Sequence, residues 1–149
     1  MKFFNMLIMT AAVLFASDNG YSTKSNWLMD IDSANGRFEA VQKQFRGFDT
    51  AMMEVGYRYE SVKKAVDEKN YELALYHWQK IKTAMQNGYV RRPAREEASR
   101  IYFLDNTYEE FKKMLVSQND TKIEERFSYV KDSCNACHIN QKVGFITVK

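Results

Sequence analysis

From Phe38 to Val66 the sequence reads FEAVQKQFRGFDTAMMEVGYRYESVKKAV. Its apolar residues recur at steps that alternate between three and four: Phe38, Val41, Phe45, Phe48, Met52, Val55, Tyr59, Val62 and Val66. This spacing keeps them on one face of an α-helix, whose period is about 3.6 residues. The stretch therefore predicts one long helix with a single buried stripe. Candidate N-caps for it are Asp30, Asp32 and Ser33.

A second helix is predicted from near Asn70 to Met85, where the apolar residues keep the same spacing. The dipeptide Asn87-Gly88 is typical of a helix C-terminus. Residues 89–94 then form a connector, in which Pro93 is placed to begin the next helix.

Two more helices are predicted downstream. The third has its stripe at Ala98, Ile101, Leu104, Tyr108, Phe111 and Leu115. We expect a kink or break in it at residues 105–107, because Thr107 and Glu110 fit a capping box. The fourth opens with a second capping box, Thr121 and Glu124. Its stripe runs into two cysteines: Ile123, Phe127, Val130, Cys134 and Cys137.

Four amphipathic helices joined by short turns predict an all-α fold, an antiparallel four-helix bundle. The length of 149 residues suits one domain, and the six glycines, one proline and 28% charged residues are typical of a compact helical protein. The last segment, residues 143–148, is apolar and is expected to fold back over the core.

The N-terminus is expected to lie outside that domain. Lys2 is followed by a short apolar run and then by small and polar residues, which is typical of a secretory signal. We assign residues 1–20 to the signal peptide, with the cleavage site open, and residues 21–149 to the mature domain. The alternative is an N-terminal anchor that is kept, although the run is short for a spanning helix. We therefore expect an exported protein with no stable membrane insertion after processing.

The charge excludes some partners. Removing residues 1–16 takes away Lys2 and no acidic residue, so the net charge falls from +3 to +2. Neither nucleic acid nor anionic lipid is therefore an expected partner.

The motif Cys134-Asn135-Ala136-Cys137-His138 is the attachment signature of c-type haem. On a helix, positions i and i+3 lie on one face, so both cysteines can form thioethers with the porphyrin vinyl groups. His138 then supplies the proximal iron ligand. The alternatives are a thiol–disulfide pair, which normally follows a strand, and a zinc site, for which His77 is the only other histidine. The motif predicts a single covalent haem c near the C-terminus.

The distal side of the iron is open to several interpretations. Met52 lies on the stripe of the first helix and is either core filler or a ligand. His77 is either a ligand or a hydrogen-bonded surface residue. Other methionines that offer a sulfur are Met29, Met53, Met85 and Met114. Without a protein ligand, the iron would be five-coordinate and open to small gases.

A late Cys-x-x-Cys-His on the final helix of a four-helix bundle resembles the class II c-type cytochromes, the cytochrome c′ group and its low-spin relatives. Met52 followed by Arg58, the segments 70–74 and 143–146, and the haem motif carry the likeness, which covers most of the mature chain. The resemblance implies that Met52 is the distal iron ligand. A homodimer, and a location in the periplasm of a Gram-negative bacterium, are expected by the same analogy. The chain departs from the family at Tyr59, where many such sequences have histidine.

Together these features predict a mono-haem electron carrier that works with redox partner proteins. The alternative is a cytochrome c′-like protein that binds NO or CO in a pocket lined by Phe48, Met52 and Val55. No enzymatic activity is expected, since no distal histidine–arginine pair can be placed. A basic cluster pairs either with the propionates or with an acidic partner, or is a solvated turn: Arg91, Arg92 and Arg95.

Overall fold

The computed structural model describes residues 26–149, so the predicted signal peptide lies outside the described residues. Within this range the chain separates into two units, residues 26–41 and 42–149, and each is described by itself. No β-strand occurs in the described range, which confirms the all-α prediction there. In the first unit the Ser33 hydroxyl accepts the N–H of Gly36 at 3.0 Å, so Ser33 is a cap for the helix that follows.

The prediction of one long helix over residues 38–66 is wrong. The chain instead forms α1 (Ala34–Phe45) and α2 (Phe48–Asp67). Arg46, between them, adopts a left-handed conformation with φ at 58°.

Local side-chain hydrogen bonds accompany this break. The Asp49 carboxylate accepts the N–H of Gly47 at 3.0 Å, and the Thr50 hydroxyl donates to the Phe45 carbonyl at 3.0 Å. Such bonds offer the backbone partners that a continuing helix would otherwise supply. Apolar spacing runs unbroken through the junction, so the stripe alone cannot reveal it.

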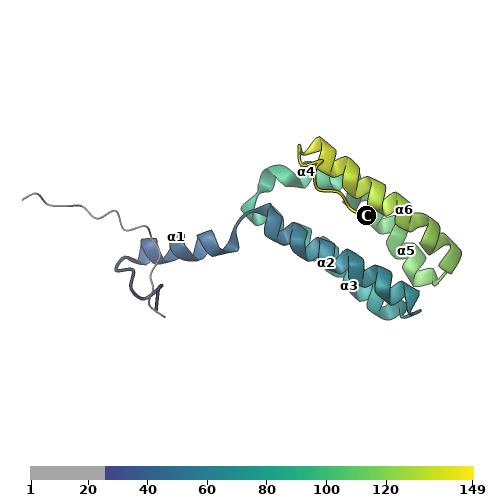
Figure 1. The fold of residues 1–149 in the computed structure, drawn as a ribbon, viewed down its shortest axis with the longest axis horizontal. Helices are drawn as coiled ribbons and strands as arrows, with labels where there is room; N and C mark the ends of the chain where they lie inside the picture. The colour runs from purple at the N-terminus through teal and green to yellow at the C-terminus, as the bar shows by residue number, and fades with distance from the viewer. Residues whose placement is uncertain (1–25) are drawn as a thin grey trace, which may run out of the picture. The chain divides into compact units, whose positions relative to one another are not determined.

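The second unit contains four helical segments, and consecutive segments reverse direction (Figure 1). They are α2, α3 (Tyr71–Arg91), the run η1 (Pro93–Arg95), α4 (Glu96–Ser99), η2 (Arg100–Tyr108) and α5 (Glu109–Ser117), and α6 (Asp120–Asn140). Extensive packing joins α2 to α3, and α6 packs on η2 and α5. This arrangement is a helical bundle.

Helix α3 begins as predicted, because the Asn70 side chain accepts the N–H of Leu73 at 3.1 Å. The predicted end at Asn87-Gly88 is wrong, since α3 continues to Arg91. Gly88 is needed instead for close helix packing. A Cβ there would lie 2.6 Å from the Phe48 ring and 2.8 Å from the Cβ of Ala51.

The third segment does not break at residues 105–107. It continues through the π-helical turns of η2, and Thr107 shares a hydrogen bond of 2.9 Å with Ser133 of α6 instead of capping a helix. The capping box expected at Thr121 is also wrong, because Asn119 caps α6 by accepting the N–H of Lys122 at 3.1 Å. Pro93 does begin a helical segment, η1, as predicted.

The core lies between α2, α3, η2, α5 and α6. Its largest fully buried apolar side chains are Trp78, Phe111, Ile81, Leu115, Ile123, Val62 and Val130. Among residues 26–149, no helix combines the length and apolar character that crossing a bilayer requires.

Candidate functional site

Helix α6 presents both cysteines on its apolar face. Ile123 and Val130 are fully buried on that face, and Cys134 and Cys137 continue it toward the end of the helix. The predicted stripe is therefore confirmed. Both thiols are partly buried, and no disulfide joins them.

Burial dominates the electrostatics of the two thiols. It raises the pKa of Cys134 to about 12, with a smaller contribution from the nearby Cys137. Burial also raises the pKa of Cys137, and the charge of Arg95 opposes that rise. Reactive dithiols show the reverse, a lowered pKa that favours the thiolate.

His138 follows Cys137 on α6, and its ring is fixed by a hydrogen bond. The Nδ1 atom lies 2.7 Å from the carbonyl oxygen of Ile146. A carbonyl can only accept, so Nδ1 carries the hydrogen and Nε2 keeps its lone pair. Histidines that bind metals commonly donate their second N–H to a carbonyl in this way, which fixes the ring orientation.

The tail after α6 turns back along the helix that it leaves. Val143 N–H donates to the carbonyl of His138 at 2.9 Å, and the Ile146 N–H donates to the carbonyl of Val143 at 2.9 Å. Phe145 remains 83% exposed, so the expectation that the tail covers the core is wrong. It contacts the end of α6 through polar bonds instead.

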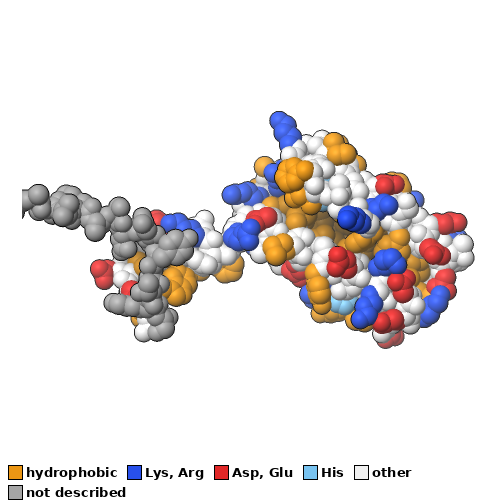
Figure 2. Space-filling model, viewed as in Figure 1, with side chains coloured by type: hydrophobic (Ala, Val, Ile, Leu, Met, Phe, Trp, Pro, Cys, Tyr) orange, Lys and Arg blue, Asp and Glu red, His pale blue; other side chains and the backbone are white. Residues whose placement is uncertain are grey.

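An apolar furrow runs between α2 and α6. These two helices lack the extensive backbone packing that joins α2 to α3. Figure 2 shows hydrophobic side chains in the hollow between the α2–α3 layer and the layer of α4, α5 and α6. We define the furrow by partly buried residues of α2 and α6 that pack against the core: Phe48, Met52, Val55, Tyr59, Phe127 and Cys134.

The register of the furrow places Met52 near the level of the Cys-x-x-Cys-His motif. The ring of Tyr59 lies 5.9 Å from that of Phe127, and Tyr59 is close enough to Cys134 for the thiolate charge to raise its pKa. Helices α2 and α6 run in opposite directions (Figure 1). A step of seven residues back from Tyr59, to Met52, therefore matches the same step forward on α6, which leads to residues 134–141. Cys137 and His138 lie in that range.

Two tyrosines flank the cysteines, and the sequence alone did not assign them this place. Tyr59 lies beside Cys134, where burial is the main cause of its raised pKa. Tyr89 lies near Cys137, and its hydroxyl shares a hydrogen bond of 2.6 Å with Ser99. Tyr59 belongs to the apolar stripe predicted for the first helix. Tyr89 lies in the predicted connector, where nothing in the sequence indicated a place beside the cysteines.

His77, the other candidate for the distal ligand, is held by contacts with α2 and with its own helix. His77 accepts a hydrogen bond at Nδ1 from Arg58, 3.2 Å away, and its ring lies against those of Tyr57 and Tyr76. Burial and the charge of Arg58 lower its pKa.

The basic cluster ties segments together through backbone carbonyls. Arg91 donates to the carbonyl of Gly47 at 3.2 Å, and Arg95 donates to the carbonyl of Gln141 at 3.3 Å. Arg92 donates to the carbonyl of Arg91 at 3.3 Å. Of the three, Arg95 is the one whose charge lowers the pKa of a motif thiol, that of Cys137.

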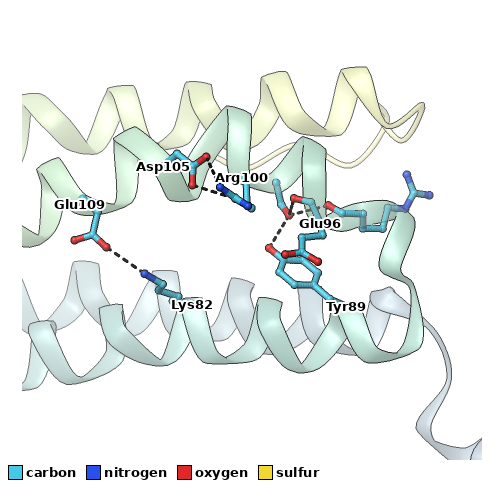
Figure 3. A network of polar contacts seen from close by, with 8 residues as sticks. Lys82, Tyr89, Glu96, Arg100, Asp105 and Glu109 are labelled. Carbon is cyan, nitrogen blue, oxygen red and sulfur yellow. Dashed lines mark hydrogen bonds and ion pairs between the residues drawn. The ribbon is translucent and has the colours of Figure 1, made fainter.

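A separate polar groove of 280 Å³ lies between α3 and the segment α4–η2 (Figure 3). Arg100 donates to Asp105 across one π-helical turn, at 3.3 Å, and Lys82 pairs with Glu109 at 3.2 Å. Both of these cations already have a carboxylate partner, so neither Lys82 nor Arg100 is left unpaired for an anionic ligand.

Within residues 26–149, no three histidine, cysteine, aspartate or glutamate side chains converge in a group that could hold a metal ion. Comparison with known proteins gives no match to the chain among family models, curated proteins or solved structures.

Proposed function

We propose that the chain is an exported mono-haem c-type cytochrome that transfers electrons. Cys134 and Cys137 would hold the haem through thioethers, and His138 would bind the iron through Nε2. One observation carries the proposal: two partly buried cysteines share a face of α6, and the histidine after them has its Nδ1 N–H committed to the carbonyl of Ile146. That arrangement leaves one nitrogen ready for a metal.

The furrow fits such a group. A porphyrin needs an apolar surrounding, and partly buried aromatic and aliphatic side chains of α2 and α6 provide it next to Cys134. The raised pKa of Cys134 disfavours the alternative of a dithiol redox pair. A structural zinc site is disfavoured too, because it needs four converging ligands, of which the described residues offer no group of three.

Met52 is the proposed distal ligand, and the register of α2 and α6 supports this, because it matches Met52 with residues 134–141, a range that includes Cys137 and His138. When bound, the haem supplies reversible one-electron chemistry at iron, and a histidine–methionine pair raises its potential. The chain's own residues hold the group, exclude water with the furrow side chains and orient the imidazole of His138. This arrangement is that of the low-spin relatives of cytochrome c′.

Residues 1–20 are the proposed export signal, and the periplasm is the proposed location. Redox proteins are the proposed partners. If the iron has no distal ligand, the same furrow would bind NO or CO, with Phe48, Met52 and Val55 around the gas.

The test begins with the purified protein. The haem should stay on the polypeptide after denaturation, and replacing Cys134 and Cys137 with alanine should abolish its retention. Absorption spectra in both redox states should be low-spin, with the near-infrared band of methionine–iron ligation in the ferric form.

Met52→Ala should convert the spectrum to high-spin. Met53→Ala is the matched control, because that side chain is 68% exposed and should leave the spectrum unchanged. A low-spin spectrum in Met52→Ala would show that the ligand assignment is wrong. A high-spin wild-type spectrum that responds to CO would favour gas binding over electron transfer.

A further inference from the structure

The side chain of Asn135, inside the haem motif, ties the tail to α6. Its amide nitrogen donates to the carbonyl of Val148 at 3.1 Å, and its amide oxygen accepts the N–H of Val148 at 2.8 Å. Both backbone groups of one tail residue are thus satisfied by one side chain. Among side chains, only the amides of asparagine and glutamine offer a donor and an acceptor in this way.

The tail has little apolar burial to hold it in place. Phe145 and Ile146 are 83% and 52% exposed. Two backbone bonds fix its start, from Val143 to His138 and from Ile146 to Val143. The pair made by Asn135 fixes its far end at Val148, beyond Ile146.

Ile146 lies between these two anchor points, and its carbonyl is the acceptor for His138 Nδ1 at 2.7 Å. If the segment were loose, water could replace this carbonyl as the hydrogen-bond partner of His138. Holding the segment at both ends keeps the acceptor in place, which fixes the ring orientation of His138.

We propose that Asn135 is a positioning residue for His138, acting through the tail. It holds Val148, and this keeps the Ile146 carbonyl on the Nδ1 N–H of the imidazole. The inference rests on the proposed function, in which His138 binds the haem iron. A donated N–H makes an imidazole more basic, which stabilises the ferric form relative to the ferrous form.

The experiment measures two properties of the haem-loaded protein: the reduction potential and hydrogen exchange of the tail amides. Asn135→Ala should speed exchange at Val148 and Ile146 and raise the potential. The expected change in the ferrous-to-ferric ratio is about tenfold, or about 59 mV for one electron. Asn135→Gln keeps both amide functions and should restore a large part of both properties.

Val148→Pro reaches the same contact without altering the haem motif, because proline lacks the N–H that Asn135 accepts. It should shift the exchange of the Ile146 amide and the potential in the same direction as Asn135→Ala, since residue 148 itself then has no amide to follow. Asn87→Ala is the control, since Asn87 is an exposed asparagine on α3, and it should change neither property.

A looser tail with an unchanged potential would overturn the proposal, because Asn135 would then be structural alone. A raised potential with a protected tail would overturn it as well, since the effect would not pass through the tail. Failure of the proposed function gives a different result: the wild-type protein would carry no covalent haem. The bond would then still be measurable by the tautomer of His138 in nuclear magnetic resonance spectra, where Asn135→Ala should reduce the Nδ1–H form.

Discussion

The cluster around Trp78 and the furrow between α2 and α6 differ in how completely their side chains are buried. Around Trp78, which is fully buried, side chains of α3, η2 and α5 form a closed aromatic cluster. The Trp78 ring lies 4.5 Å from that of Phe111 and 5.3 Å from that of Tyr108, and its indole N–H donates to the Tyr108 carbonyl at 3.0 Å. The furrow between α2 and α6 is lined by equally apolar residues that stay partly exposed.

This difference indicates what each region is for. In the aromatic cluster the apolar side chains bury one another, and the buried indole N–H of Trp78 has a hydrogen-bond acceptor. The cluster is therefore complete without a group from outside the chain. The furrow residues, Cys134 among them, are only partly buried, so burial of their remaining exposed apolar surface by another group would be favourable. Removing a ring from the cluster is therefore expected to cost more stability than removing one from the furrow, where we propose that the cofactor binds.

The largest expected effect is that of Phe111→Ala, in the closed cluster. Phe111 is 0% exposed, and loss of a fully buried phenylalanine costs about 3–5 kcal/mol. Phe127→Ala, in the furrow, should cost about 1–2 kcal/mol, because that ring is only partly buried. Urea unfolding followed by circular dichroism measures both. Equal losses for the two variants would break the distinction between the cluster and the furrow.

A smaller effect is expected at the close approach of α3 to α2. Gly88→Ala should destabilise the protein by about 2 kcal/mol, because its Cβ would overlap the Phe48 ring. Gly56→Ala is the matched control in α2, where a Cβ would meet nothing within 4 Å. It should stabilise by about 0.5–1 kcal/mol through helix propensity. Thermal unfolding of the two variants would show opposite shifts, and a neutral Gly88→Ala would mean that α2 and α3 are less closely packed.

The smallest effect is a pH dependence from Tyr108. Burial raises the pKa of its phenol from 10.0 to about 12, so the folded state holds the proton more tightly than the unfolded state. This contribution to stability is complete below the unfolded pKa and is lost as the pH rises through the folded pKa. At about pH 11 the loss should be about 1.4 kcal/mol.

Tyr108→Phe removes the titrating group and should abolish the loss in the free energy of unfolding between neutral pH and about pH 11 that this phenol causes. Tyr59→Phe, in the furrow, should reduce the loss less, since the phenol there is only partly buried. Urea unfolding at neutral and alkaline pH compares the three proteins. A wild-type profile as flat as that of Tyr108→Phe would mean that the Tyr108 phenol is solvated.

The sequence predicted what depends on local side-chain direction. Spacing of apolar residues predicted the helical fold, the start of α3 and the shared face of Cys134 and Cys137. The proline itself predicted the start of the segment at Pro93. It failed where side chains make specific hydrogen bonds. The break at Arg46, the cap at Asn119 and the π-helical continuation past Thr107 all lie in stretches whose apolar pattern allows another outcome.

The sequence by itself determined that a helix would carry two cysteines on its apolar face with a histidine beside them, because a helical period fixes which positions share a face. Only the tertiary structure decided that Gly88 is a packing residue instead of a cap, and that the carbonyl of Ile146 meets His138. It also decided that α2 and α6 leave a furrow between them. Contacts between distant segments depend on how whole helices pack, and neither spacing nor residue type records that.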